Sequence, residues 1–156
     1  MTPEEKLKEL GFELQEPNAP IANYVPWVRT GNLIYLSGQG PNRAGDTNAT
    51  VYDGKLGERY GIEEGYQAAQ QTAFNLLCAL KAATGDLSKV SRIVKVLGMV
   101  NSAPDFADQP KVINGCSELL VEVFGDKGKH ARSAVGMGAL PNNIPVEIEF
   151  IAEVED

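Results

Sequence analysis

The sequence contains few of the residues that build metal centres or disulfide frameworks. Its 156 residues include one histidine, His130, and two cysteines, Cys78 and Cys116. A metal site needs a cluster of ligands at suitable spacing, and no such cluster accompanies His130. Both cysteines fall on apolar helical faces, so we expect buried, reduced thiols rather than a disulfide. The composition therefore predicts neither a metal site nor a stabilising disulfide.

Basic residues are also scarce relative to acidic ones. The 14 Lys and Arg residues are outnumbered by 21 Asp and Glu residues, which gives a net charge of -7. Neutralisation of phosphates by Lys and Arg supplies most of the affinity of proteins for nucleic acids, and no basic cluster offsets the imbalance. We therefore expect no nucleic-acid partner.

Long hydrophobic runs are absent as well. No apolar run approaches the roughly 20 residues of a membrane span, and the N-terminus begins with charged residues instead of a signal-peptide core. We expect a soluble, cytoplasmic protein with no membrane partner. The length and the 43% hydrophobic content suit one domain, residues 1–156, with one core.

Hydrophobic periodicity and turn residues predict an α+β domain. Two long helices are expected: residues 63–83, which end before Gly85, and residues 105–124, whose regular part begins near Pro110. The shorter expected elements are a capped helix at 3–10 and strands at 12–14, 27–30, 33–37, 91–100, 133–140 and 146–154. The order of these elements places both long helices on one face of a sheet.

The last two strands are expected to form a hairpin. The segment 133–140 is small and apolar, residues 141–143 supply turn chemistry, and residues 146–154 alternate apolar with acidic side chains. Arg132 and Glu147 then lie at the two outer ends of this hairpin. In-register pairing does not place them directly opposite each other, but we expect them to share one cleft.

The sheet face without helices needs another covering surface. Small residues at Ala134, Gly136, Gly138 and Ala139 suit the close approach of a second subunit. Between the predicted strands, residues 42–62 form a long, polar, Gly-rich connection. Such loops are often functional. This loop either distinguishes a group of related proteins with its own substrate or only adds residues to the rim of the cleft.

Two separated segments of the chain resemble one known family. Ala131-Arg132-Ser133, Leu140-Pro141 and Pro145-Val146-Glu147-Ile148-Glu149 resemble the C-terminal signature of the RidA/YjgF family. Tyr24 and the strand that ends in Ser37-Gly38-Gln39 resemble its N-terminal part, so that the resemblance spans residues 20–153. It implies a chorismate mutase-like fold and a homotrimer with clefts between subunits. It also implies a cofactor-independent imine and enamine deaminase.

Arg132 is the expected anchor for a small carboxylate. Its planar fork of donors matches the carboxylate of a 2-imino or 2-oxo acid. Spacing alone leaves an exposed ion pair as an alternative, and the match to Ala-Arg-Ser favours the anchor. Many family members carry cysteine where this chain has Ala134, and this departure puts the substrate range in doubt. His130 is expected at the rim, with an ordinary solvated imidazole.

Glu147 is the expected water-orienting group. Its parity with Glu149 and Glu153 also fits a solvated acidic face, but the family pattern singles out the first glutamate of Pro-Val-Glu-Ile-Glu. Tyr24 is assigned to the substrate pocket by the resemblance. Backbone groups of Ser37, Gly38 and Gln39 are expected to line the cleft, although a strand end looks similar in a structural role.

These expectations lead to three function classes. The first is a hydrolase that resembles 2-iminobutanoate/2-iminopropanoate deaminase and converts 2-imino or enamino acids to 2-oxo acids and ammonia. The second is a non-catalytic trimeric protein that binds a small carboxylate metabolite, suggested by Ala134 and the long loop. The third is an endoribonuclease or translation inhibitor, a label of some family members, which the acidic composition opposes.

Overall fold

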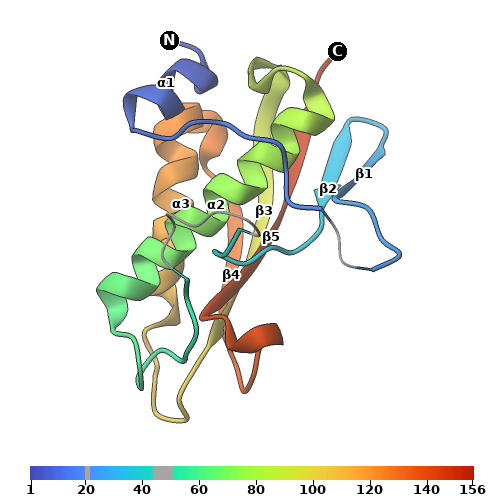
Figure 1. Cartoon of the computed structure of the whole chain (residues 1–156). Coiled ribbons are helices and arrows are strands. Elements are labelled where there is room, and N and C mark those ends of the chain that lie inside the picture. The colour runs from blue at the N-terminus through green and yellow to red at the C-terminus, as the bar shows by residue number, and fades with distance from the viewer. Residues whose placement is uncertain (20–21, 44–50) are drawn as a thin grey trace.

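The computed structural model describes residues 1–19, 22–43 and 51–156, which form helices packed on a mixed sheet (Figure 1). The helices are α1 (Pro3–Glu9), α2 (Ile62–Thr84) and α3 (Gln109–Phe124). The strands are β1 (Trp27–Thr30), β2 (Leu33–Leu36), β3 (Val90–Asn101), β4 (Ala131–Met137) and β5 (Val146–Val154). The predicted α+β class is confirmed.

The five strands lie in the order β1-β2-β5-β3-β4. All neighbouring pairs are antiparallel except β3 and β4, which run parallel. The predicted hairpin around Gly31 and Asn32 is confirmed, since Thr30 pairs with Leu33 at the turn. The sheet ends in two edge strands, β1 and β4.

The predicted hairpin between β4 and β5 is wrong, because β3 lies between these strands. β3 is the longest strand, and all its residues except Arg92 are buried or half-buried. A strand of this kind gains most when it pairs on both sides, so it takes the place between the other two. Asn101, at the end of β3, holds the connection that passes from β4 to β5 across the end of β3. Its backbone N–H donates to the carbonyl of Pro145, and its side-chain amide donates to the carbonyl of Ile144.

Both long helices cover one face of the sheet (Figure 1). The buried residues of β5 alternate along the strand, and they share this face: Val146, Ile148, Phe150, Ala152 and Val154. The helices approach each other closely at Gly115 of α3, where an added Cβ would lie 2.0 Å from the carbonyl oxygen of Tyr66. Only glycine fits this crossing. Cys78 and Cys116 are buried thiols within this layer.

The predicted ends of the helices agree well with the structure. Thr2 and Glu5 form the capping box of α1, and Gly85 adopts a left-handed conformation with φ 75° after α2. The predicted strand at residues 12–14 is wrong. Phe12 instead packs its ring on Phe74 of α2, with centroids 5.1 Å apart. The apolar side chains at 12 and 14 therefore serve packing on a helix rather than strand pairing.

The long connection at 42–62 lies partly outside the described residues, since 44–50 belong to the omitted segment. Its described second half is packed against the fold. Leu56 is fully buried, and its backbone N–H donates to the carbonyl of Asn101. Asn42 exchanges two hydrogen bonds with the backbone of Tyr52. The segment 51–61 is thus packed against the fold, and the two interpretations of the whole connection, as a substrate-specific loop or as a surface rim, stay predictions. No described helix has the length and apolarity needed to cross a membrane.

Candidate functional site

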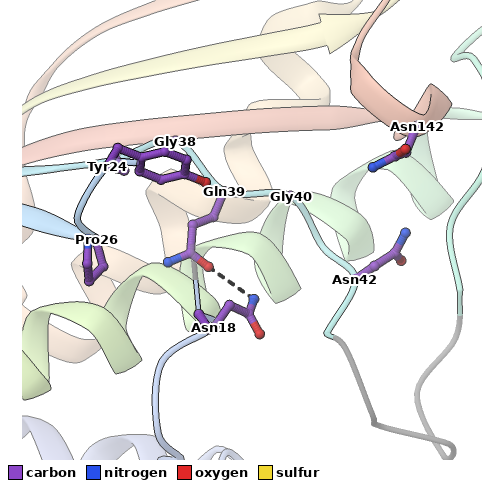
Figure 2. A pocket seen from close by; sticks show the side chains of 10 residues that line it. Asn18, Tyr24, Pro26, Gly38, Gln39, Gly40, Asn42 and Asn142 are labelled. Carbon is purple, nitrogen blue, oxygen red and sulfur yellow. Dashed lines mark hydrogen bonds between the residues drawn. The ribbon is translucent and has the colours of Figure 1, made fainter. Parts of the chain in front are cut away.

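A pocket of about 310 Å³ opens beside the end of β2 (Figure 2). The residues predicted from the N-terminal half of the chain, Tyr24, Ser37, Gly38 and Gln39, all line it. The rest of the lining was not predicted: Asn18, Ala19, Pro26, Gly40, Asn42 and Asn142. The asparagines come from three separate loops, so no local sequence pattern marked them as neighbours. The described lining combines polar and apolar groups and contains no charged side chain.

Ser37 and Gln39 hold the pocket walls together. The Ser37 hydroxyl donates to the carbonyl of Val25 at 2.6 Å, which fixes the segment that carries Tyr24. The Gln39 side chain accepts from the Asn18 amide at 3.2 Å, as Figure 2 shows, and its backbone exchanges hydrogen bonds with Ile148 of β5. The hydroxyl of Ser37 is therefore committed to positioning Tyr24. The Tyr24 ring is itself 48% exposed.

Glu147 projects from the sheet face that carries no helices. It follows Val146 and precedes Ile148, both fully buried against the helices, and side chains alternate along a strand. A Cβ placed on Gly38 would lie 3.2 Å from Glu147 Oε2, so glycine leaves room for the carboxylate beside the pocket. Gly38 thus lies between the pocket, which it lines, and Glu147, which does not line the cavity.

The environment of Glu147 disfavours its charged form. Burial raises the pKa of this carboxyl, and the nearby Glu149 raises the pKa further. Within the described part of the chain, the carboxylate has no hydrogen-bond or ion-pair partner. A half-buried carboxylate with free acceptor atoms and a raised pKa can hold a water molecule and accept its proton.

Arg132 lies on the other face of the sheet. It pairs with Val96 of β3, and its Nη1 donates to Asn114 Oδ1 at 2.9 Å and to Ser117 Oγ at 3.1 Å, both on α3. Glu147 pairs with Met99. Two strand spacings and three residues along β3 therefore separate them, roughly 10 Å in each direction. One copy of the chain does not bring Arg132 and Glu147 into one cleft, contrary to the expectation from the hairpin.

Ala134 shares the helix-facing side with Arg132. It pairs with Gly98 of β3 and packs against the core, so it does not line the pocket beside Gly38. A larger side chain at this position would point toward α3, where Ile113 already fills the space over Gly98. Ala134 and Arg132 thus lie on the same, helix-facing side of β4. The other predicted site residues lie in or beside the pocket at the end of β2.

His130 is not the solvated rim residue that the sequence suggested. Its Nε2 lies 2.9 Å from Ser117 Oγ, and its Nδ1 lies 2.6 Å from the carbonyl oxygen of Gly128. Burial lowers the pKa of the imidazole, Arg132 lowers it further, and the bond to Gly128 partly opposes this. Asn114 and Ser117 were missed. The available signal was a pair of polar residues, three apart, on the face that α3 turns toward β4.

Comparisons with known proteins agree with this architecture. Residues 4–154 match the protein family described as YjgF/chorismate mutase-like, whose description adds an endoribonuclease label. The Trypanosoma cruzi protein TCP17 is 39% identical over 151 residues, which cover 96% of this chain and 92% of the relative. The 2-iminobutanoate/2-iminopropanoate deaminase of Dermatophagoides farinae is 36% identical over 137 residues, 87% of this chain and 89% of the relative.

A solved structure gives the same result. A protein of unknown function from Agrobacterium tumefaciens is 45% identical and superposes with a TM-score of 0.88 over 98% of this chain and 92% of its own. The predicted chorismate mutase-like fold is thereby confirmed. The family match extends over almost the whole chain and includes both the Gly38 pocket and the Arg132 cluster. The chain belongs to the RidA/YjgF family.

Proposed function

We propose that the protein is a hydrolytic deaminase of small 2-imino or enamino acids, which it converts to 2-oxo acids and ammonia. The observation that carries this proposal is the Glu147 carboxylate, half-buried and unpaired within the described residues, beside a pocket-lining glycine. A relative that is 36% identical bears the name of such a deaminase. We assign Glu147 to the water and Arg132 to the substrate carboxylate.

The reaction needs positioning and proton transfer only. Glu147 orients a water molecule and accepts one of its protons as the oxygen attacks the imine carbon. The resulting carbinolamine loses its C–N bond when the nitrogen is protonated, and ammonia leaves with the 2-oxo acid behind. Every atom comes from the imine and one water, so the proposal requires no cofactor. Tyr24 closes one side of the pocket in which the imine lies.

The opposite placement of Arg132 and Glu147 leads us to propose that the site forms between copies of the chain. β4 is an edge strand, and Arg132 lies at that edge. The helix-free face also exposes apolar side chains that another copy can bury, including Val28 at 56%, Tyr35 at 43% and Val135 at 39%. We therefore retain the homotrimer as part of the proposal, with Arg132 of one copy facing the Gly38 pocket of the next.

A non-catalytic binding role is the second candidate. The side-chain amides of Asn18, Gln39 and Asn142 in the pocket lining suit an uncharged polar ligand group. The net charge of -7 opposes the endoribonuclease label that the family carries. Binding of a 2-oxo acid without any acceleration of imine hydrolysis would favour this second role.

The decisive experiment generates 2-iminobutanoate with an amino-acid oxidase and follows ammonia release with and without the protein. We expect acceleration by the wild type and by Glu149→Gln, and none by Glu147→Gln. Equal, near wild-type rates for both variants would assign Glu147 to a solvated acidic face. A wild type that accelerates no 2-imino acid would overturn the deaminase proposal.

A further inference from the structure

The contacts of His130 fix the direction of a hydrogen-bond chain. The carbonyl oxygen of Gly128 only accepts, so the Nδ1 beside it, at 2.6 Å, carries the proton. In the neutral ring the Nε2 then has a free lone pair and accepts from the Ser117 hydroxyl, 2.9 Å away. The hydroxyl hydrogen of Ser117 is thereby committed to His130. Its oxygen lone pairs are left to accept from Arg132.

Contacts with Asn114 and Ser117 occupy both hydrogens of one nitrogen of the Arg132 guanidinium. Nη1 carries two hydrogens, and it has two acceptors, Asn114 Oδ1 at 2.9 Å and Ser117 Oγ at 3.1 Å. The hydrogens on Nε and Nη2 remain. These two nitrogens form the side edge of the fork, where parallel N–H bonds fit the two oxygens of a carboxylate. The contacts of Nη1 therefore leave the Nε–Nη2 edge of Arg132 as the edge that can bind a carboxylate.

The partners of Arg132 leave its positive charge unneutralised. Asn114 and Ser117 are neutral acceptors, and Arg132 forms no ion pair within the described ranges. An aspartate at position 114 would give similar geometry and would compete with any bound anion. A half-buried cation held only by uncharged hydrogen-bond acceptors is the arrangement expected where the carboxylate of a ligand supplies the countercharge.

We propose that Asn114, Ser117 and His130 are positioning residues, which together hold Arg132 so that its Nε–Nη2 edge receives the carboxylate of the substrate. The proposal rests on the proposed function for its ligand class, a small 2-oxo or 2-imino acid. None of the three positioning residues touches the reacting carbon. Their effect reaches the substrate only through Arg132.

The test uses the full-length protein, 2-oxobutanoate as the probe, and the ring nitrogens of its only histidine, His130, followed by ¹⁵N NMR. We expect the Nδ1–H tautomer in the free wild type and a change of the Nε2 signal when the probe binds. Ser117→Ala should weaken binding about threefold to tenfold, the range of one ordinary hydrogen bond, and should abolish the Nε2 response. Ser117→Thr keeps the hydroxyl and should restore both.

Asn114→Asp is the matched test of charge. It keeps the size and an acceptor for Nη1 but places a negative charge against Arg132, so affinity for 2-oxobutanoate should fall roughly tenfold or more. Lys111→Gln, an exposed change on the same helix, should leave affinity unchanged. Melting curves identify any variant that fails to fold.

Each outcome separates the two proposals. An Nε2–H tautomer, or Ser117→Ala and Asn114→Asp that bind like the wild type, would overturn the positioning role and leave the deaminase proposal standing. A response of the His130 signal to 2-oxobutanoate without accelerated imine hydrolysis would overturn the deaminase proposal and leave the positioning role. A wild-type His130 signal that ignores the probe would overturn the positioning role, whatever the activity.

Discussion

The two faces of the sheet carry the two groups that we propose for hydrolysis, Glu147 on one face and Arg132 on the other. On the helix-free face, Glu147 is a carboxylate with free acceptor atoms beside Gly38, and the described lining of the adjoining pocket holds no cation. On the helix face, Arg132 is a cation held by neutral partners, and the pocket is not lined by it. Each half has what the other lacks. This difference is the reason for proposing that Arg132 and Glu147 meet between copies of the chain.

The largest expected effect is the loss of the carboxylate that we propose to orient the water. Glu147→Gln keeps the size of the side chain but removes the proton acceptor, so turnover of 2-iminobutanoate should fall about 100-fold or more. Affinity for 2-oxobutanoate should change little, because Arg132 is untouched. Steady-state kinetics and calorimetry measure the two quantities. Comparable losses in affinity and turnover would show that Glu147 serves binding rather than the water.

Mixing two inactive variants tests whether the halves meet between copies. Arg132→Lys loses the two-point grip, and Glu147→Gln loses the base. If Arg132 of one copy faces Glu147 of the next, random assembly of equal amounts leaves about a quarter of the sites with both native residues. Activity should then recover to about that fraction after joint unfolding and refolding. No recovery, with assembly confirmed by light scattering, would contradict the composite site.

A smaller effect is expected where the pocket meets the carboxylate. In Gly38→Ala the new Cβ would lie 3.2 Å from Glu147 Oε2 and push the carboxylate aside, so turnover should fall by roughly tenfold. Gly61→Ala is the matched control, because an added Cβ there also lies 3.2 Å from a glutamate oxygen, Glu64 Oε2, and neither residue lines the pocket. Equal activity of the two variants would show that the contact between Gly38 and Glu147 does not position the base.

The sequence predicted the parts of this comparison that depend on local chemistry. The alternation of β5 gave its bounds and placed Glu147 on the face opposite Val146 and Ile148. Gly85 and the proline near the start of α3 gave the helix ends. These signals lie within a few residues of the feature that they describe.

Strand order and the face of Arg132 could not be predicted in the same way. β4 consists largely of small residues and glycine, so its sequence shows no parity that separates an inner from an outer face. Turn residues at 141–143 fit a hairpin as well as a crossing over β3. The contact between Ser117 and His130 joins α3 to the residue before β4 and depends on the folded arrangement alone.

The smallest effect concerns stability, and it separates the pocket from the Arg132 cluster without any substrate. Burial raises the pKa of Glu147 in the folded protein, so the protonated form is favoured by folding. That contribution is present at pH values below the unfolded pKa, and it is lost as the pH rises through the higher, folded pKa.

At neutral pH the ionised carboxylate therefore destabilises the fold, and Glu147→Gln should slightly raise the melting temperature. The gain should shrink as the pH falls through the raised pKa of Glu147 and below its ordinary value of 4.5, because the wild-type side chain then also becomes uncharged. Ser117→Ala should instead lower the melting temperature, because it removes two hydrogen bonds. Melting curves across this range, by circular dichroism, measure both. A Glu147→Gln protein less stable than the wild type at neutral pH would show that the carboxylate has a stabilising partner in the assembled protein, and the water-orienting role would lose its basis.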